Sequence, residues 1–382
     1  MSPISKRWIV APETTPAGRH ALADFDPILA QILFNRGLAD PALARAFLDG
    51  EYTRPDDPLL MIGVPAAVDR LRRAIRAGEK IAVYGDYDTD GVTATALLVT
   101  ALDSVGANVR PKIPNRFDEG YGLNNEALSG LKDEGVAVVV SVDCGIRSLD
   151  EADHARRIGL DLIISDHHHV GEELPRALAV INPKQAGDEY PEEGLAGVGL
   201  AYKIAQALLR AENRGVAEES LLDLVALGTV ADLAPLTGEN RVLVRRGLKT
   251  LNQAKREGLK SLIALSRAKP GQIDATTIGF TLGPRLNAAG RLESALAAYE
   301  LLMTADTFKA SQFAQQLEQQ NRERQRLTVE TQKQAREIVL AKEPDAPFLF
   351  AAHRDFSPGI VGLAAARLTE EFYRPSAVAQ IG

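Results

Sequence analysis

The chain has 382 residues, a formal net charge of −7 and a hydrophobic fraction of 45%, which together exclude a disordered chain and one that coats nucleic acid through bulk positive charge. Cys144 is the single cysteine, so an intramolecular disulfide framework is excluded and a reducing compartment is indicated. Because no signal-peptide pattern and no apolar run of bilayer length occur, we expect a cytoplasmic protein without membrane contact.

The first part of the chain predicts a parallel sheet covered by helices. Residues 1–78 have the pattern of a small, mainly helical lead-in, with a helix over 65–77. Short β-branched apolar runs then alternate with helix-like stretches. The runs are 80–84, 137–142 and 160–165, and the helical stretches include 93–104 and 149–158. Alternation of this kind is typical of α/β proteins whose parallel sheet carries helices on both faces.

The second part of the chain predicts a connector and a smaller unit. Residues 195–265 have a helical pattern, and the polar stretch 306–341 predicts one long helix that bridges two domains. A strand over 348–352, a helix over 359–372 and a strand over 376–381 indicate the start of a second α/β unit, which looks unfinished at Gly382. The expected domains are a lead-in (1–78), a sheet domain (79–305), a connector helix (306–343) and a partial second domain (344–382).

Acidic residues follow each of the three predicted strands. Asp86, Asp88 and Asp90 follow the first, Asp143 follows the second, and the run Asp166-His167-His168 follows the third. Because the carboxyl ends of parallel strands meet at one edge of the sheet, these side chains should converge. Carboxylates so crowded cannot all ionise without a cation. Mixed carboxylate and imidazole donors suit Mn²⁺ or Mg²⁺, so the sequence predicts a site for two such ions.

Simpler explanations exist for some of the same residues. A lone aspartate after a strand is commonly a helix N-cap, and Asp90 could cap a helix that starts at 91–93. Capping does not explain His167 and His168, whereas His169 is ambiguous and is left outside the site. No base is indicated for Cys144, which favours a small buried residue over a nucleophile. The Asp-x-Asp pattern at 86–88 also occurs in phosphatases with an aspartyl nucleophile. Their motif would require Thr or Val where the chain has Asp90, which disfavours this interpretation.

Four ordered motifs resemble those of the DHH phosphoesterase superfamily. They are GDYDTDG at 85–91, VDCG at 142–145, DHH at 166–168 and GTVADLAP at 228–235. Further segments resemble the RecJ branch, a family of single-strand-specific exonucleases. These segments are 32–48 of the lead-in, RFDEGYGL at 116–123, LAGVGL at 195–200 and GPRLNAAGR at 283–291.

The resemblance implies roles for particular residues around two Mn²⁺ or Mg²⁺ ions. Asp88 and Asp90 would each hold one metal and Asp143 would bridge them, while His167 and Asp232 would complete the ligand set. The same resemblance makes His168 a ligand or a contact of the scissile phosphate, and makes Asp86 a further candidate ligand. It also implies substrate contacts, which are Arg285, Asn287, Arg116 and Tyr121.

The resemblance further implies stepwise 5′→3′ release of 5′-mononucleotides from single-stranded DNA, in repair and recombination. The expected partner is single-stranded DNA, with single-strand-binding protein and a helicase as candidate protein partners and a monomer as the expected state. Tyr84 and the sequence FSPG at 356–359 depart from the common pattern, and the Gly-Gly-His motif and oligonucleotide-binding barrel are absent from the sequence. The alternatives are an oligoribonucleotide or cyclic-dinucleotide phosphodiesterase and a non-catalytic DNA-binding scaffold.

Overall fold

The centre of the molecule is a five-stranded parallel sheet. The computed structural model describes residues 7–115, 119–342 and 346–382. The strand order is β2-β1-β3-β4-β5, and every pairing is parallel. The strands are β1 (Lys80–Gly85), β2 (Asn108–Lys112), β3 (Val136–Val142), β4 (Asp161–Ser165) and β5 (Ala179–Ile181). Strands β2 and β3 lie on opposite sides of β1, so the strand order switches direction between β1 and β3. In parallel sheets of this kind, ligands bind at such a switch point.

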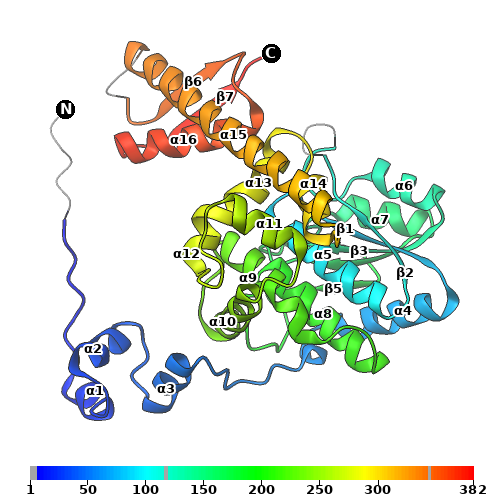
Figure 1. The fold of residues 1–382 in the computed structure, drawn as a ribbon, viewed down its shortest axis with the longest axis horizontal. Helices are drawn as coiled ribbons and strands as arrows, with labels where there is room; N and C mark the ends of the chain where they lie inside the picture. Colours follow the sequence, from blue (N-terminus) through cyan, green and yellow to red (C-terminus); the bar gives the residue numbers. More distant parts are fainter. Residues whose placement is uncertain (1–6, 116–118, 343–345) are drawn as a thin grey trace.

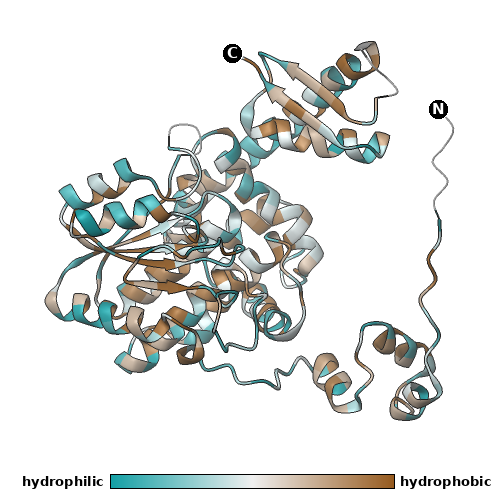
Figure 2. Cartoon of the chain, turned by 180° about the vertical axis from the view of Figure 1, so that it is seen from behind, coloured by the Kyte–Doolittle hydropathy of each residue, from teal (hydrophilic) through white to brown (hydrophobic). Residues whose placement is uncertain are grey.

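Alternate residues of each central strand enter two separate cores. Ile81 and Val83 of β1 pack in one core, and Ala82 and Tyr84 pack in the other. The first face is covered by α4 (Val64–Ala77), α5 (Thr89–Ser104) and α8 (Gly197–Glu212), and the second by α6 (Asn125–Asp133) and α7 (Leu149–Arg157). Figure 2 shows apolar strands between helices whose outer faces are polar. The sheet is therefore buried on both sides, as continuous apolar runs require.

A helical layer extends the larger core beyond the sheet. Buried residues of this layer, such as Leu224, Leu259 and Leu301, belong to the same core as α5 and α8. It consists of η2 (Glu218–Leu221), α9 (Leu222–Ala231), α10 (Gly238–Asn252), α11 (Glu257–Leu265), α12 (Ala275–Thr277), η3 (Ile278–Leu282), α13 (Gly283–Leu292) and α14 (Leu296–Met303). Helices α9 and α13 of this layer both contact α5, the helix that follows β1.

The lead-in and the carboxyl-terminal unit each have a small core of their own. In the lead-in, α1 (Pro16–Ala21), α2 (Pro27–Asn35) and α3 (Pro41–Asp49) each begin with a proline after a capping side chain. A short turn, η1 (Pro58–Leu60), precedes α4. The long helix α15 (Thr307–Lys342) leads to β6 (Leu349–His353), α16 (Pro358–Phe372) and β7 (Ser376–Gln380) (Figure 1). Leu349 and Phe356 pack there against Ala335 and Val339 of α15.

The predicted α/β class with a covered parallel sheet is confirmed. The helix expected from residue 93 instead begins four residues earlier, at Thr89, because the Asp88 side chain caps it there. Two strands were missed: β2 is a polar edge strand that contains Pro111, and β5 has three residues. Among the described residues, no helix is both long enough and apolar enough to span a bilayer.

Candidate metal centre

The loop after β1 places two carboxylates against the start of α5. Asp88 caps this helix, since its Oδ1 accepts hydrogen bonds from the backbone N–H groups of Asp90 (2.8 Å) and Gly91 (3.1 Å). Asp86 is 4% exposed and lies where a Cβ on Gly91 would approach its backbone nitrogen to 2.6 Å. Glycine at 91 therefore allows the helix to begin directly against the loop that carries the acids.

Asp90 is buried between α5 and the first turn of α8. Its Oδ2 accepts a hydrogen bond from the N–H of Gly197 (2.7 Å), and its Oδ1 accepts one from the N–H of Val198 (2.8 Å). These donors belong to the N-terminal turn of a helix, whose N–H groups lack helical partners. The expectation that Asp90 could be only an N-cap of its own helix is wrong, because Asp88 performs that role.

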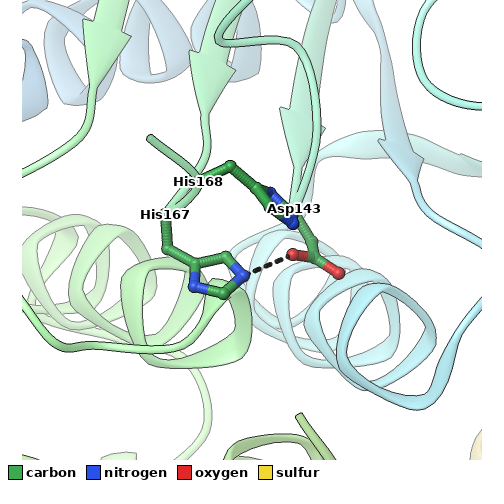
Figure 3. A group of neighbouring side chains, drawn as sticks. All are labelled: Asp143, His167 and His168. Carbon is green, nitrogen blue, oxygen red and sulfur yellow. Dashed lines mark ion pairs between the residues drawn. The ribbon is translucent and has the colours of Figure 1, made fainter. Parts of the chain in front are cut away.

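Asp143 follows β3 and points into the same space as His167. Its backbone has a left-handed φ of 64°, and its side chain is almost fully buried. Asp143 Oδ1 lies 3.0 Å from His167 Nε2 (Figure 3). The two atoms are not aligned for a hydrogen bond, and within the described part of the chain neither has another hydrogen-bond partner. Two buried polar atoms directed at a common space fit a bound cation.

His167 lies between three carboxylates from different elements. Besides its contact with Asp143, its Nε2 is 3.8 Å from Asp90 Oδ2, and its Nδ1 is 3.9 Å from Asp232 Oδ2. Burial, together with the charge of His168, lowers the pKa of His167 to about 4. The imidazole is therefore neutral near pH 7, which is the form that ligates metals.

The carboxylates of the cluster repel one another in a buried setting. Burial and the charges of Asp232 and Asp88 raise the pKa of Asp90 well above its usual range. Burial and the charges of neighbouring carboxylates, Asp90 first, likewise raise the pKa of Asp143. Burial with the charge of Asp88 raises the pKa of Asp232 to about 6. Divalent cations would remove this repulsion. Three sets of ligating atoms lie within 4.8 Å of one another: Asp143-His167-His168, Asp90-His167-Asp232 and Asp86-Asp88-Asp143.

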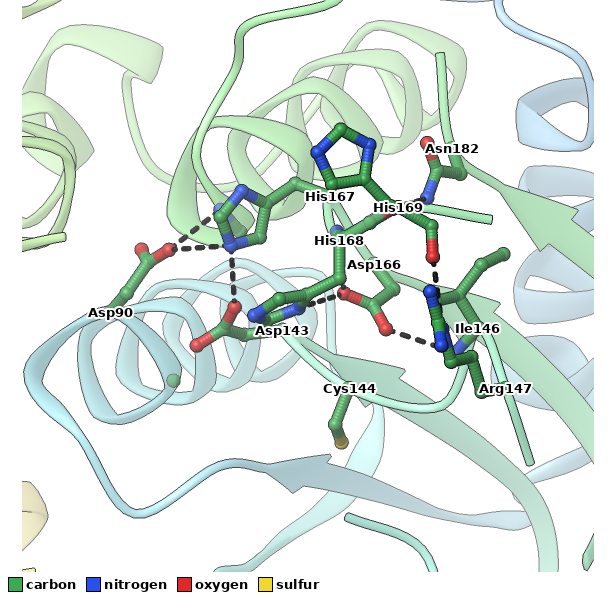
Figure 4. Close-up of polar contacts among 12 residues, drawn as sticks. Asp90, Asp143, Cys144, Ile146, Arg147, Asp166, His167, His168, His169 and Asn182 are labelled. Carbon is green, nitrogen blue, oxygen red and sulfur yellow. Dashed lines mark hydrogen bonds and ion pairs between the residues drawn. The ribbon is translucent and has the colours of Figure 1, made fainter. Parts of the chain in front are cut away.

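Asp166 orients His168. Its Oδ1 accepts a hydrogen bond from the backbone N–H of His168 (3.1 Å) and lies 2.7 Å from His168 Nδ1, while its Oδ2 accepts one from Ile146 N–H (2.9 Å) (Figure 4). The hydrogen bond that His168 donates to Asp166 raises the pKa of His168 despite partial burial. With Nδ1 held by Asp166, the Nε2 of His168 is the ring nitrogen left for a ligand.

The backbone of the His167–His168 segment is held by residues after β5 that the sequence did not indicate. Asn182 Nδ2 donates to the carbonyl oxygen of His168 (2.9 Å), and Lys184 Nζ donates to that of His167. Asn182 and Lys184 follow a three-residue strand. The signal that could have identified them is polar residues at the carboxyl end of one more parallel strand, but that strand was missed.

An open pocket of about 490 Å³ adjoins the cluster. Tyr121 stands at its wall, with its ring edge-on to Tyr87 (6.2 Å between centroids) and to His168 (6.4 Å). The lining residues are Asp86, Tyr87, Asp88, Tyr121, His168, Asn287, Gly290 and Arg291. Carboxylates that could hold cations and groups that could contact a phosphate therefore face one space.

The predicted substrate contacts meet three different outcomes. Tyr121 and Asn287 line the pocket. Arg285 does not, because its guanidinium donates to Glu318 Oε2 (2.7 Å) and to the carbonyl oxygen of Thr281 (2.6 Å). Arg291, six residues later in the same motif, lines the pocket instead and was missed. The predicted contact at Arg116 lies outside the described residues.

Cys144 is fully buried beside Asp143. Burial raises the pKa of its thiol well above the usual value, and the charges of Asp166 and Asp86 raise it further. A thiol that stays protonated and inaccessible cannot act as a nucleophile. The interpretation of Cys144 as a small buried residue is confirmed.

Comparisons with known proteins agree with this geometry. The family described as "DHH family, N-terminal domain" matches residues 80–229. The single-stranded-DNA-specific exonuclease RecJ of Bacillus subtilis is 44% identical over 352 residues, which cover 92% of this chain and 44% of that protein. The chain spans about half the length of the curated relatives it matches.

Two solved structures are also similar. A crystal structure of exonuclease RecJ bound to manganese has a TM-score of 0.77 and 34% identity, and the match covers 85% of this chain and 82% of that one. A structure of RecJ from Thermus thermophilus in complex with Mn²⁺ has a TM-score of 0.83 and 30% identity. That match covers 96% of this chain and 53% of the Thermus protein.

Proposed function

The chain belongs to the RecJ family of DHH phosphoesterases, and on that premise we propose that it is a metal-dependent 5′→3′ exonuclease of single-stranded DNA that releases 5′-mononucleotides. The observation that carries the proposal is the convergence of acids and imidazoles from the ends of β1, β3, β4 and α9 beside an open pocket. The relatives named above are exonucleases specific for single-stranded DNA, which supports that substrate.

We propose that the cluster holds two cations, Mn²⁺ or Mg²⁺. One cation would be held by Asp90, His167 and Asp232, and the other by Asp86 and Asp88. Asp143 shares one set of ligating atoms with His167 and another with Asp86 and Asp88, so it would bridge the two cations. Two such ions would lower the pKa of an attacking water and stabilise charge on the phosphate oxygens during hydrolysis. The donor types suit these ions, because the cluster has oxygen and imidazole ligands and no thiolate in reach.

The other residues of the site would position the substrate. The Asp166–His168 pair keeps a proton on His168 to a higher pH than usual, so that His168 can donate a hydrogen bond to a phosphate oxygen. Tyr121 is 57% exposed and offers a ring on which a base can stack. Arg291 and Asn287 also line the pocket and would contact phosphate oxygens. No protein nucleophile is required for this chemistry.

The proposal is tested by degradation of end-labelled substrates with Mn²⁺. Single strands labelled at the 5′ end should release labelled mononucleotide at once, whereas strands labelled at the 3′ end should shorten gradually. Duplexes with blunt ends should resist. Activity confined to cyclic dinucleotides or to short oligoribonucleotides would contradict the proposal and support the alternative phosphodiesterase. Binding of single strands without any hydrolysis would support the scaffold instead.

A further inference from the structure

Leu233 follows Asp232 directly and is held in a strained backbone conformation. Its φ is 61°, in the left-handed region that a leucine rarely adopts. Its N–H and that of Ala234 donate to the carbonyl oxygens of Val230 (3.2 Å) and Thr229 (3.3 Å), so it occupies the turn that closes α9, where glycine is the usual residue. Leu233 is nevertheless 86% exposed, so its side chain gains little from packing. A leucine that costs stability where glycine would not points to a function outside the fold.

Phe280 is a second exposed apolar residue, on a segment that contacts α9. Helices α12 and α13 are joined by η3, which is a single π-helical turn. Pro284 has no N–H to donate to the carbonyl oxygen of Phe280, so the α-helical pattern cannot pass through this turn. Ile278 and Leu282 of the turn are buried, whereas Phe280 is 82% exposed. The turn therefore places an aromatic ring in solvent, and π-helical turns are frequent at functional sites.

The segments that carry these two residues meet next to Asp232. Helix α9 contacts η3, and a Cβ on Gly283 would lie 3.3 Å from the Cβ of Ala231. The side chain of Asp232 is partly exposed, whereas that of Asp90, in the same set of candidate ligands, is fully buried. A strand that approaches the candidate cations from the side of Asp232 therefore passes close to Leu233.

The pocket described above lies on the side of the other candidate cation. Its walls include Asp86, Asp88 and Tyr121, and the described residues that line it do not include Leu233 or Phe280. An exonuclease must hold one nucleotide on one side of the cut, whereas the strand continues on the other side. The pocket, with a limited volume of about 490 Å³, suits the single nucleotide. Two apolar side chains in open solvent suit the continuing strand, because exposed bases stack on such surfaces whatever their sequence.

We propose that Leu233 and Phe280 form an apolar platform for bases of the strand that continues beyond the cut. The inference rests on the proposed function for the identity of the ligand. Bases on the platform would hold the strand beside Asp232 while the terminal nucleotide occupies the pocket. Because these contacts are the same before and during hydrolysis, the platform contributes to affinity and not to the rate of the chemical step.

The platform predicts a variant that is more stable than the unmodified chain but binds DNA less tightly. Leu233→Gly relieves the left-handed strain, so its melting temperature should rise by about 1–3 °C. Its affinity for an oligothymidine of about 20 nucleotides should fall about 5-fold, and that of Phe280→Ala about 10-fold. Affinity is measured by the anisotropy of a 3′ label. Ca²⁺, which carboxylates also bind, replaces Mn²⁺ to keep the strand in register, and the recovered strand is checked to be intact.

Tyr373→Gly is the matched control. Tyr373 is also exposed and has a left-handed φ of 52°, in the turn after α16. It stands at the opposite end of that helix from Gly359, which is pressed against the carbonyl oxygen of Arg291 at the end of α13. Tyr373→Gly should therefore raise the melting temperature in the same way and leave the affinity for DNA unchanged.

Strands with one abasic site test which bases the platform holds. Loss of the second or third base from the 5′ end should weaken binding by the unmodified chain and should remove most of its advantage over Leu233→Gly, because partners are coupled. Coupling at the first base alone, or at none, would overturn the platform. Equal affinity of Leu233→Gly, Phe280→Ala and the unmodified chain would overturn it as well. A chain that shows the expected coupling but hydrolyses no strand with Mn²⁺ supports the platform and contradicts only the proposed function.

Discussion

Replacing Asp143 with asparagine should reduce hydrolysis of single-stranded DNA by about 10³-fold or more. The substitution keeps the shape of a side chain that is 2% exposed, but it removes the charge that faces His167 and that contributes to two of the three candidate sets of metal ligands. The rate is measured under saturating Mn²⁺ with a 5′-labelled strand. Asp153→Asn is the matched control, because among the described residues Asp153 pairs only with Arg156, at an exposed position, and its replacement should leave the rate unchanged. Comparable rates for the two variants would refute the bridging role of Asp143.

The same variant should be more stable than the unmodified chain when metal is removed, and this gain should depend on pH. Burial and neighbouring carboxylates raise the pKa of folded Asp143 above its unfolded value. The folded state then binds more protons, so the unmodified chain loses stability as pH rises from the unfolded towards the folded pKa. Asp143→Asn should therefore raise the metal-free melting temperature by about 2–4 °C at pH 8 and have no effect near pH 3. An equal effect at both pH values would contradict this cause.

Gly197→Ala should disable the site through its backbone. A Cβ at this position would lie 2.7 Å from Asp143 Cβ and 2.8 Å from its Oδ1, while the N–H of Gly197 donates to Asp90 Oδ2. Either Asp143 or the first turn of α8 must move, which displaces two candidate ligands at once. We expect the free energy of unfolding to fall by about 1–3 kcal/mol. Activity should fall by about 10²-fold, as a misplacement near 1 Å would cause.

Gly199 provides the matched control on the same helix. A Cβ there would meet Leu195 at 3.4 Å, an ordinary contact. Gly199→Ala should therefore fold as well as the unmodified chain or slightly better, since alanine favours a helix by up to ~1 kcal/mol. Activity and chemical denaturation are measured for both variants. If Gly197→Ala matched Gly199→Ala in both measurements, close packing of α8 on Asp143 would not be required.

The acid cluster was predictable because its cause is local and repeated. Each predicted strand is an apolar run followed at once by ligand-type residues, and parallel strands must bring those ends together. Asp88, Asp143 and His167 could therefore be placed at one edge without knowledge of the rest of the chain. The family resemblance drawn from four motifs is also confirmed. The roles of individual residues and the domain boundaries stay predictions.

The predictions from the sequence were wrong or incomplete where contacts between distant parts of the chain determine the role of a residue. Arg285 and Arg291 lie in one motif, but only the packing of α13 on α15 shows that Glu318 binds the first, while the second lines the pocket. The support that Gly197 and Val198 give to Asp90 joins residues more than 100 positions apart. Strand β5 was missed because three residues show no periodicity, and the residues after it that hold the histidines were missed with it.

Binding of two divalent cations by the converging acids and imidazoles is the feature on which the proposed chemistry depends. Anomalous diffraction at the manganese edge, from crystals grown with Mn²⁺, tests it most directly. We expect two peaks, one beside Asp90, His167 and Asp232 and one beside Asp86 and Asp88, with Asp143 in contact with both. Crystals of Asp143→Asn should lose at least one peak. No manganese at the ends of β1 and β3, or manganese bound only elsewhere, would contradict the two-metal site.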